Sequence, residues 1–203
     1  MPHKPTRALI GALLFGAAGA AAAFGPARFG GEAAPLLQLA EMKSTSCDNL
    51  KVHLEPAGDF RKIECSKGQT GYGGETGWSM ATKIFATDAI SWIVVFHDEA
   101  GVQTYFERMG PQTLFQDWMD EAIDGSWTTG TGANGYAVSR FFAKFDGVKV
   151  PCFAYSRFGS HVSGTSGYRQ RVAGVYCEQI TSEQPVTAER IKEMIGKIKT
   201  KLF

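Results

Sequence analysis

The sequence YAVSRFFAKFDGVKVPCFAYSRF, residues 136–158, contains two strand-like runs joined by Asp146 and Gly147. An Asp-Gly pair between two such runs is a strong signal for a type I′ hairpin, because both central residues of that turn need a positive φ. The turn also sets the register, so that Phe145 opposes Val148 and Phe141 opposes Cys152. The stretch therefore predicts an antiparallel hairpin over residues 136–145 and 148–158.

The two faces of this predicted hairpin differ in chemistry. One face is small and apolar, as expected for packing on a core. The other face carries basic and aromatic side chains, which are the predicted binding site: Arg140, Phe142, Lys144, Lys149, Phe153, Tyr155 and Arg157. Charge combined with aromatic stacking suits an envelope protein or an anionic polymer or glycan. The alternatives are that helices cover this face or that its charges only solvate it.

The flanking sequence predicts a third strand and two helices. Residues 168–180 complete an antiparallel meander over residues 136–180. A C-terminal helix is expected after Thr187, with an apolar stripe formed by Ile191, Ile195, Ile198 and Leu202. A second helix is expected over residues 113–123, and a buried strand over residues 90–96. The expected fold class is α+β, a two-layer sandwich in which helices pack on one face of the meander.

The N-terminal residues have the pattern of an export signal. A basic opening with Lys4 and Arg7 precedes an uncharged apolar run over residues 8–24. This pattern predicts a signal peptide over residues 1–23, cleaved after Ala23, and the alternative is an uncleaved anchor in the inner membrane. Residues 24–45 are expected to form a flexible linker, and residues 46–203 a single globular α+β domain. The protein is thus expected to be periplasmic or secreted, without stable membrane insertion once the signal is removed.

The four cysteines all lie in the predicted mature chain. An even number in an exported protein favours disulfides, although four cysteines allow three connectivities. Cys47 and Cys65 lie at similar distances from a turn-like segment at residues 56–59, so a hairpin between them would bring them together. Cys152 and Cys177 flank the loop near residue 162 in the same way. The preferred pairing is therefore Cys47–Cys65 and Cys152–Cys177.

Charge and motif content exclude several classes of function. Removal of Lys4 and Arg7 leaves 19 basic residues against 20 acidic residues, which argues against a role in binding nucleic acid. No C-x-x-C pair is present, so a thioredoxin-like motif or a zinc ribbon has little support. The G-x-G-x-x-G match at residues 130–135 precedes a strand instead of a helix, which predicts a flexible loop. The sequence therefore predicts no metal site and no cofactor.

Two weak catalytic motifs remain. Ser79 lies in Gly-Trp-Ser-Met-Ala, which is similar to the G-x-S-x-G motif of serine hydrolases, and its partner would be His97 or His161. The preceding glycine-rich residues 68–77 predict a loop instead of the strand that this motif requires. His97, Asp98 and Glu99 follow the apolar run at residues 90–96, and a solvated turn is preferred there over a metal or acid/base site.

Opposite charges are segregated along the chain. Residues 98–124 are strongly acidic, whereas the meander is basic. Together these features favour a non-enzymatic, exported, disulfide-stabilised module for binding or envelope assembly, which uses the basic and aromatic face. The alternative is a small serine hydrolase that uses Ser79.

Overall fold

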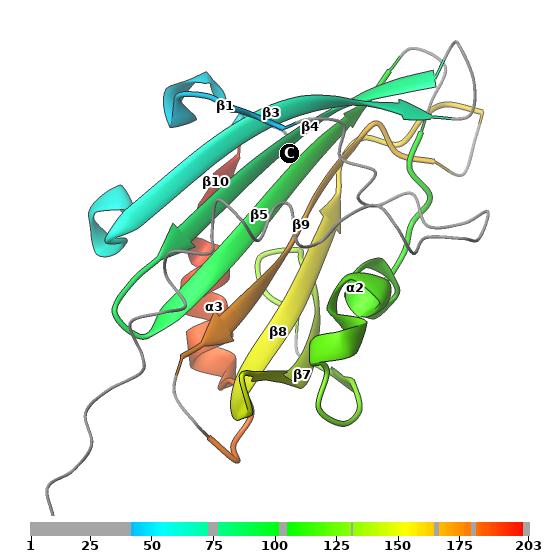
Figure 1. Cartoon of the computed structure of the whole chain (residues 1–203). Helices are drawn as coiled ribbons and strands as arrows, with labels where there is room; N and C mark the ends of the chain where they lie inside the picture. Colours follow the sequence, from blue (N-terminus) through cyan, green and yellow to red (C-terminus); the bar gives the residue numbers. More distant parts are fainter. Residues whose placement is uncertain are drawn as a thin grey trace, which may run out of the picture. The chain divides into compact units, whose positions relative to one another are not determined.

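The computed structural model describes residues 42–72, 77–101, 105–130, 132–164, 167–179 and 182–200, without the side chains of residues 70–72, 77–79, 117, 118 and 121. The described residues form a large antiparallel sheet (Figure 1). Its strands, in spatial order, are β1 (Lys43–Ser44), β3 (Lys62–Tyr72), β4 (Gly77–Thr87), β5 (Ser91–Ala100), β9 (Gln170–Glu178), β8 (Val148–Phe158), β7 (Ala137–Phe145) and β6 (Thr128–Thr129).

This architecture corrects the expected fold class. The α+β two-layer sandwich is wrong, because the described residues are mostly antiparallel strand with two short helices, α2 (Pro111–Met119) and α3 (Ala188–Gly196). The helices also lie on opposite faces of the sheet instead of sharing one (Figure 1). Much of the additional strand comes from β3 and β4, whose glycine-rich ends were expected to form a loop. Backbone pairing along 11 register positions makes these residues extended despite their composition.

The predicted hairpin is confirmed in its register. Phe145 pairs with Val148, and Phe141 pairs with Cys152. Asp146 and Gly147 have φ values of 48° and 83°, as a type I′ turn requires. The strand β9 then pairs with β8, so the predicted three-stranded meander is present within a larger sheet, and its third strand is Gln170–Glu178 instead of residues 168–180.

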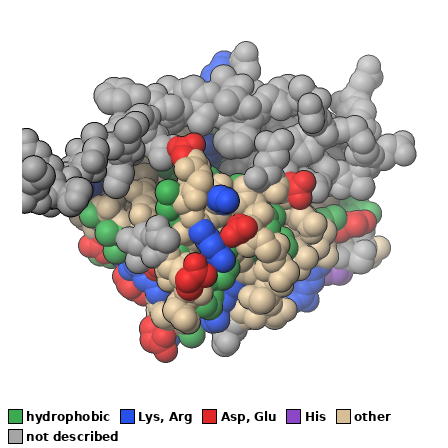
Figure 2. Space-filling model, turned by 60° about the horizontal axis from the view of Figure 1, so that its bottom comes forward, with side chains coloured by type: hydrophobic (Ala, Val, Ile, Leu, Met, Phe, Trp, Pro, Cys, Tyr) green, Lys and Arg blue, Asp and Glu red, His purple; other side chains and the backbone are tan. Residues whose placement is uncertain are grey.

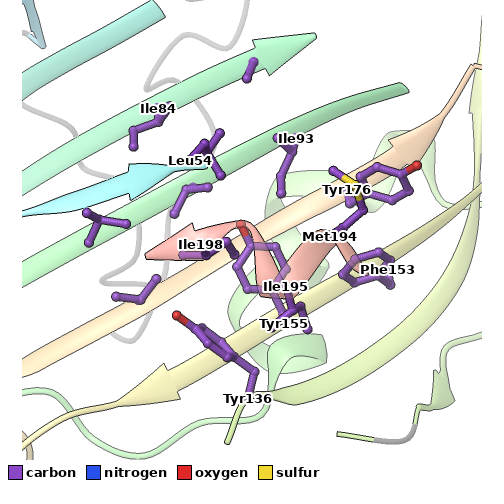
Figure 3. Close-up of a cluster of buried hydrophobic side chains, with 14 of the residues drawn as sticks. Leu54, Ile84, Ile93, Tyr136, Phe153, Tyr155, Tyr176, Met194, Ile195 and Ile198 are labelled. Atoms are coloured by element: carbon purple, nitrogen blue, oxygen red, sulfur yellow. The ribbon is translucent and has the colours of Figure 1, made fainter. Parts of the chain in front are cut away.

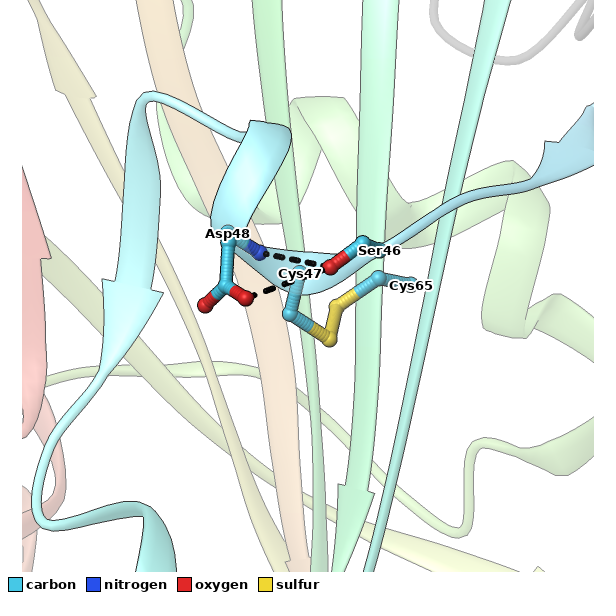
Figure 4. The surroundings of a disulfide bond; sticks show 4 residues. All are labelled: Ser46, Cys47, Asp48 and Cys65. Atoms are coloured by element: carbon cyan, nitrogen blue, oxygen red, sulfur yellow. Dashed lines mark hydrogen bonds between the residues drawn. A yellow bond between two sulfur atoms is a disulfide. The ribbon is translucent and has the colours of Figure 1, made fainter.

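Both predicted disulfides are present, Cys47–Cys65 and Cys152–Cys177. Cys152 and Cys177 are directly opposite on β8 and β9, with a Cα–Cα distance of 4.2 Å. Cys47 begins the 3-10 turn η1 (Cys47–Asn49), where the Ser46 hydroxyl accepts a hydrogen bond from the backbone of Asp48 at 3.3 Å (Figure 4). The Cys47–Cys65 disulfide therefore links η1 to β3, and the Cys152–Cys177 disulfide links the neighbouring strands β8 and β9.

The hairpin expected between Cys47 and Cys65 is wrong. The strand β2 (Val52–Leu54) pairs instead with β10 (Ile198–Thr200) in a separate two-stranded sheet. The 3-10 turn η2 (Ala57–Asp59) then leads the chain to β3. The C-terminal helix is consequently shorter than expected: Thr187 caps it, it ends at Gly196, and Ile198 lies in β10. Leu202 lies outside the described residues.

One face of the sheet, which we call the α3 face, carries the main apolar core. The helix α3 contributes Ile191, Met194 and Ile195, all at most 1% exposed. Figure 3 shows several core side chains that meet beneath this helix and β10: Leu54, Ile84, Ile93, Tyr136, Phe153, Tyr155, Tyr176, Met194, Ile195 and Ile198. Alternate residues of each central strand point here, which is the period expected of a strand.

The opposite face, which we call the α2 face, is covered in part by α2 and by the 3-10 turn η3 (Asp120–Ala122). Phe115 is fully buried, with its ring centroid 6.3 Å from that of Phe96 on β5. The small apolar face of the hairpin lies here, and Phe141, Ala143 and Cys152 are buried as expected. The helix predicted over residues 113–123 is present as α2, which begins with Pro111 in its first turn and ends at Met119, and Ile123 forms a β-bridge with Ala143 instead.

Of the N-terminal segments predicted from the sequence, the structure describes only the last residues of the predicted linker. Residues 1–41, which hold the predicted signal peptide, lie outside the described residues, while β1 falls at the end of the predicted linker. Among the described residues, no helix has both the length and the hydrophobicity needed to span a membrane.

Candidate functional site

The expectation that Phe153 and Tyr155 lie on an exposed surface is wrong. Both side chains are 0% exposed and pack beneath α3 (Figure 3). The helix has an apolar stripe of its own. When this stripe packs on the aromatic rings of the sheet, both apolar surfaces are removed from water, whereas both would stay exposed if the rings faced solvent. These two residues therefore belong to the core and have no access to a partner at the surface.

Arg157 is held within the domain. Its guanidinium lies 5.7 Å from the centre of the Tyr136 ring and donates a hydrogen bond to the backbone carbonyl of Asn134 at 3.4 Å. Burial raises the pKa of Tyr136 to about 12, and the charge of Arg157 opposes that shift. Arg157 therefore has a clear role in packing the turn before β7.

The other four predicted residues lie at or near the surface along β7 and β8. Arg140 and Phe142 are half-buried and Lys144 is exposed, and we call these three residues of β7 the β7 strip. Lys149 of β8 lies beside them, with its Nζ 4.5 Å from the centre of the Phe142 ring. The same Nζ lies 3.6 Å from Asp124 and 3.5 Å from Glu183, so its charge is largely compensated.

Arg140 differs from Lys149 in its partners. Its Nε is buried and has no hydrogen-bond partner, and no ion pair among the described residues includes its guanidinium. A buried donor without a partner costs about 1–3 kcal/mol. A planar guanidinium presents several donors in a fixed fork that matches carboxylate, sulfate or phosphate oxygens. The β7 strip thus combines the guanidinium of Arg140, which has no ionic partner among the described residues, with the ring of Phe142 and the exposed ammonium group of Lys144.

The segregated charges of the sequence meet inside the domain. Asp98 of the acidic segment accepts a hydrogen bond from Arg171 Nε at 2.8 Å and lies 2.7 Å from its Nη2, and Asp124 lies near Lys149. Figure 2 shows basic and acidic side chains interleaved on the surface that it displays instead of separated by sign. Two pairs of opposite charge from these segments are therefore formed within one molecule.

Ser79 does not lie in the turn that a hydrolase motif requires. It is the third residue of β4 and pairs with Thr70 and Ala100, and the strand continues to Thr87 without a helix. A nucleophile elbow needs a sharp turn from a strand into a helix. The side chain of Ser79 lies outside the described residues, and His161 is exposed with its ring 5.3 Å from that of Tyr168.

The solvated turn expected at His97, Asp98 and Glu99 is wrong, because all three lie in β5. His97 is 3% exposed on the α3 face, and neither ring nitrogen has a hydrogen-bond partner among the described residues. Burial lowers the pKa of His97, while the carboxylates of Glu99 and Asp98 oppose this shift. Glu99 accepts hydrogen bonds from Lys51, at 2.6 and 2.8 Å, and from Gln170 at 3.0 Å.

The remaining motifs supply no clear site. Asn134 and Gly135, with φ values of 51° and 81°, form the turn that joins β6 to β7, so the glycine-rich motif is a loop as expected. A shallow, open depression of about 620 Å³ is lined by Glu55, Pro56, Glu193, Gly196, Lys197 and Lys199. No cluster of three potential metal ligands occurs in the part of the chain that the structure describes.

Comparison with known proteins gives no relative. No family model matches the chain, and neither a curated protein nor a solved structure does. The ion pair of Asp98 with Arg171 and that of Glu99 with Lys51 were not predicted from the sequence. No local signal marks either pair, because each joins segments that are distant in the chain.

Proposed function

We propose that this protein is an exported, disulfide-stabilised binding module that holds an anionic group of an envelope polymer or glycan at the β7 strip. The single observation that carries the proposal is that Arg140 is half-buried, with a buried Nε that lacks a hydrogen-bond partner and a guanidinium without an ionic partner among the described residues. An anionic ligand would satisfy its donors, so binding removes a cost that the free protein bears.

Export is supported by the disulfides and by the N-terminal pattern. Disulfides persist in oxidising compartments and are rare where thiols are kept reduced. The basic and apolar opening of the chain is the pattern that secretion machinery recognises. The proposed location is the periplasm or the outside of the cell, either free or tethered by an uncleaved N-terminal segment.

The other residues of the β7 strip suit the same ligand. Phe142 offers a half-exposed ring for stacking against a sugar, and Lys149 over its other side restricts its position. Lys144 adds an exposed charge on the same strand. An anionic polymer is favoured over a protein partner because the strip is small and charged, whereas stable protein interfaces bury larger and less charged cores.

The export proposal predicts a processed and oxidised protein in the native host. We expect an intact mass that corresponds to cleavage after Ala23. All four cysteines should resist alkylation until a reductant is added. Mass spectrometry with and without reduction measures both properties. A full-length mass with free thiols would contradict export, whereas a full-length mass with protected thiols would indicate a tethered protein.

The binding proposal predicts that Arg140→Met weakens binding of dextran sulfate at least about tenfold, because a charged hydrogen bond contributes about 1.5–3 kcal/mol. The same variant should keep or slightly raise the melting temperature, since it removes a buried donor without a partner. Titration by fluorescence anisotropy at two salt concentrations measures the affinity, which should fall as salt increases.

Lys67→Met provides the matched control for charge. Lys67 is exposed on β3, at the opposite side of the sheet from β7, and its loss changes the net charge equally. We expect this variant to bind dextran sulfate like the wild type. Equal affinity of wild type and Arg140→Met, or equal binding of neutral dextran, would refute the anionic ligand and leave an envelope protein as the partner to test.

A further inference from the structure

Residues 47–54 cover part of the α3 face, and we call them the cover segment. Leu50, Val52 and Leu54 are buried in the core of that face. Lys51 holds the segment to the sheet through its ion pair with Glu99 of β5, at 2.6 Å. His97 lies two residues before Glu99 on the same strand, so both side chains emerge on the same face.

His97 is a polar ring enclosed without partners. It is 3% exposed, and both ring nitrogens lack hydrogen bonds among the described residues. A neutral ring tolerates this enclosure better than a charged one, because an enclosed imidazolium has two donors to satisfy and a charge to compensate. A proton on His97 therefore demands an acceptor within reach.

We propose that His97 is an acid-operated switch: once protonated, its ring competes with Lys51 for the carboxylate of Glu99, and the cover segment opens. This inference does not depend on the β7 strip or on the ligand proposed above.

The charges near His97 favour this exchange. Glu99 attracts the imidazolium, whereas Lys51 is repelled by it, and both effects weaken the pair that closes the cover segment. Asp98 also attracts the charge, but its side chain emerges on the α2 face, where it is held by Arg171. Glu99 is therefore the carboxylate on the α3 face that the protonated ring meets.

The neighbouring strands add no closer carboxylate. His97 is flanked in register by Thr82 on β4 and by Val172 on β9, neither of which titrates. One strand further out, Thr82 is paired with Lys67 on β3, and Val172 is paired with Arg157 on β8. Both of these outer residues are cationic. The cation whose charge lowers the pKa of His97 is Lys51, which adds to the effect of burial.

The direction of the pH dependence follows from the closed state. Burial lowers the pKa of His97 below its ordinary value of 6.5. The open state, where the ring meets water, binds the proton more tightly. The closed state is therefore fully favoured above about pH 6.5 and loses stability as the pH falls towards the lowered pKa, by up to about tenfold in the opening equilibrium per pH unit.

The disulfide limits how far the cover segment can open. Cys47–Cys65 keeps the start of the cover segment bonded to β3, so the segment can leave the sheet only beyond that point. The strand β10 pairs with β2 and would have to part from it or move with it. Opening would expose the apolar sides of Leu50, Val52 and Leu54 at acid pH.

Hydrogen exchange measured by mass spectrometry tests the switch at about pH 7.5 and about pH 5, with intrinsic rates corrected for pH. In the wild-type protein we expect the amides of residues 50–54 to lose protection at the lower pH, by up to roughly 30-fold, because only the about 1.5 pH units below pH 6.5 contribute. His97→Gln, which cannot titrate, should keep them protected at both pH values. Lys51→Met, which removes the clamp, should leave them less protected at both.

His161→Gln is the matched control, because His161 is an exposed histidine in the same domain. It should respond to pH like the wild type. The proposal is overturned if the wild type stays protected at both pH values, or if His97→Gln opens as the wild type does. If His97→Gln does not fold, the protonation of His97 in the wild type is followed by NMR titration instead. The switch is overturned if the cover segment opens at a pH that differs from the midpoint of this titration.

Discussion

Gly174→Ala is expected to destabilise the domain by about 3 kcal/mol or more, because the new methyl group has no space and a rigid core accommodates extra volume poorly. Gly174 lies in β9 between Val95 on β5 and Tyr155 on β8. A Cβ there would overlap the backbone carbonyl oxygen of Val94 and the Tyr155 phenol. The phenol donates a hydrogen bond to that same carbonyl at 2.9 Å, so neither group can move without breaking a buried bond.

Thermal and urea unfolding measure this effect. A loss of 3 kcal/mol corresponds to a decrease in Tm of roughly 10 °C for a domain of this size. Gly58→Ala is the matched control, since no atom lies within 4 Å of the Cβ that it adds. We expect the control to change the free energy of unfolding by less than about 0.5 kcal/mol. Equal stability of both variants would show that β9 shifts to admit the methyl group.

Arg171→Met is expected to cost about 3–5 kcal/mol, because it leaves the Asp98 carboxylate buried without its counter-charge. The two side chains are 4% and 8% exposed, and the guanidinium donates to Asp98 Oδ2 from Nε at 2.8 Å, with Nη2 at 2.7 Å from the same oxygen in the ion pair. The guanidinium carbon also lies 4.5 Å from the centre of the Phe106 ring. Urea unfolding monitored by tryptophan fluorescence measures the loss.

Two further variants separate burial from charge. Lys62→Met breaks an ion pair with Glu64 that is equally short, 2.6 Å, but whose side chains are 50% and 48% exposed, so we expect a loss below about 1 kcal/mol. The double variant Arg171→Met with Asp98→Leu should recover much of the stability of the single variant, since it removes the stranded charge. A small effect of Arg171→Met would mean that water reaches Asp98.

The sequence was sufficient for features whose partners are local. Asp146 and Gly147 specified the β7–β8 turn because few other residues accept its backbone conformation, and the turn then fixed every pair along the hairpin. Both disulfides were also predicted. The argument for Cys47–Cys65 was nevertheless wrong in detail, because it relied on a local hairpin that does not form.

The sequence was insufficient for the candidate site. It assigned Arg140, Phe142 and Lys144 to the same strand face as Phe153 and Tyr155, and it could not tell that α3 covers only the last two. Alternation along a strand shows which residues share a face, but not where a distant helix will lie on that face. Which residues of the predicted site reach the surface is therefore decided by the packing of α3 on the sheet, and the sequence alone does not show it.

What the sequence determined by itself is the local backbone: the hairpin with its register, the cap at Thr187 and the small apolar face of β7 and β8. The tertiary structure alone decided that β2 pairs with the C-terminal strand β10, that Asp98 meets Arg171, and that His97 is enclosed beside Glu99. Local features depend on the conformational preferences of adjacent residues. The distant contacts depend on which apolar surfaces exclude the most water when the whole chain packs.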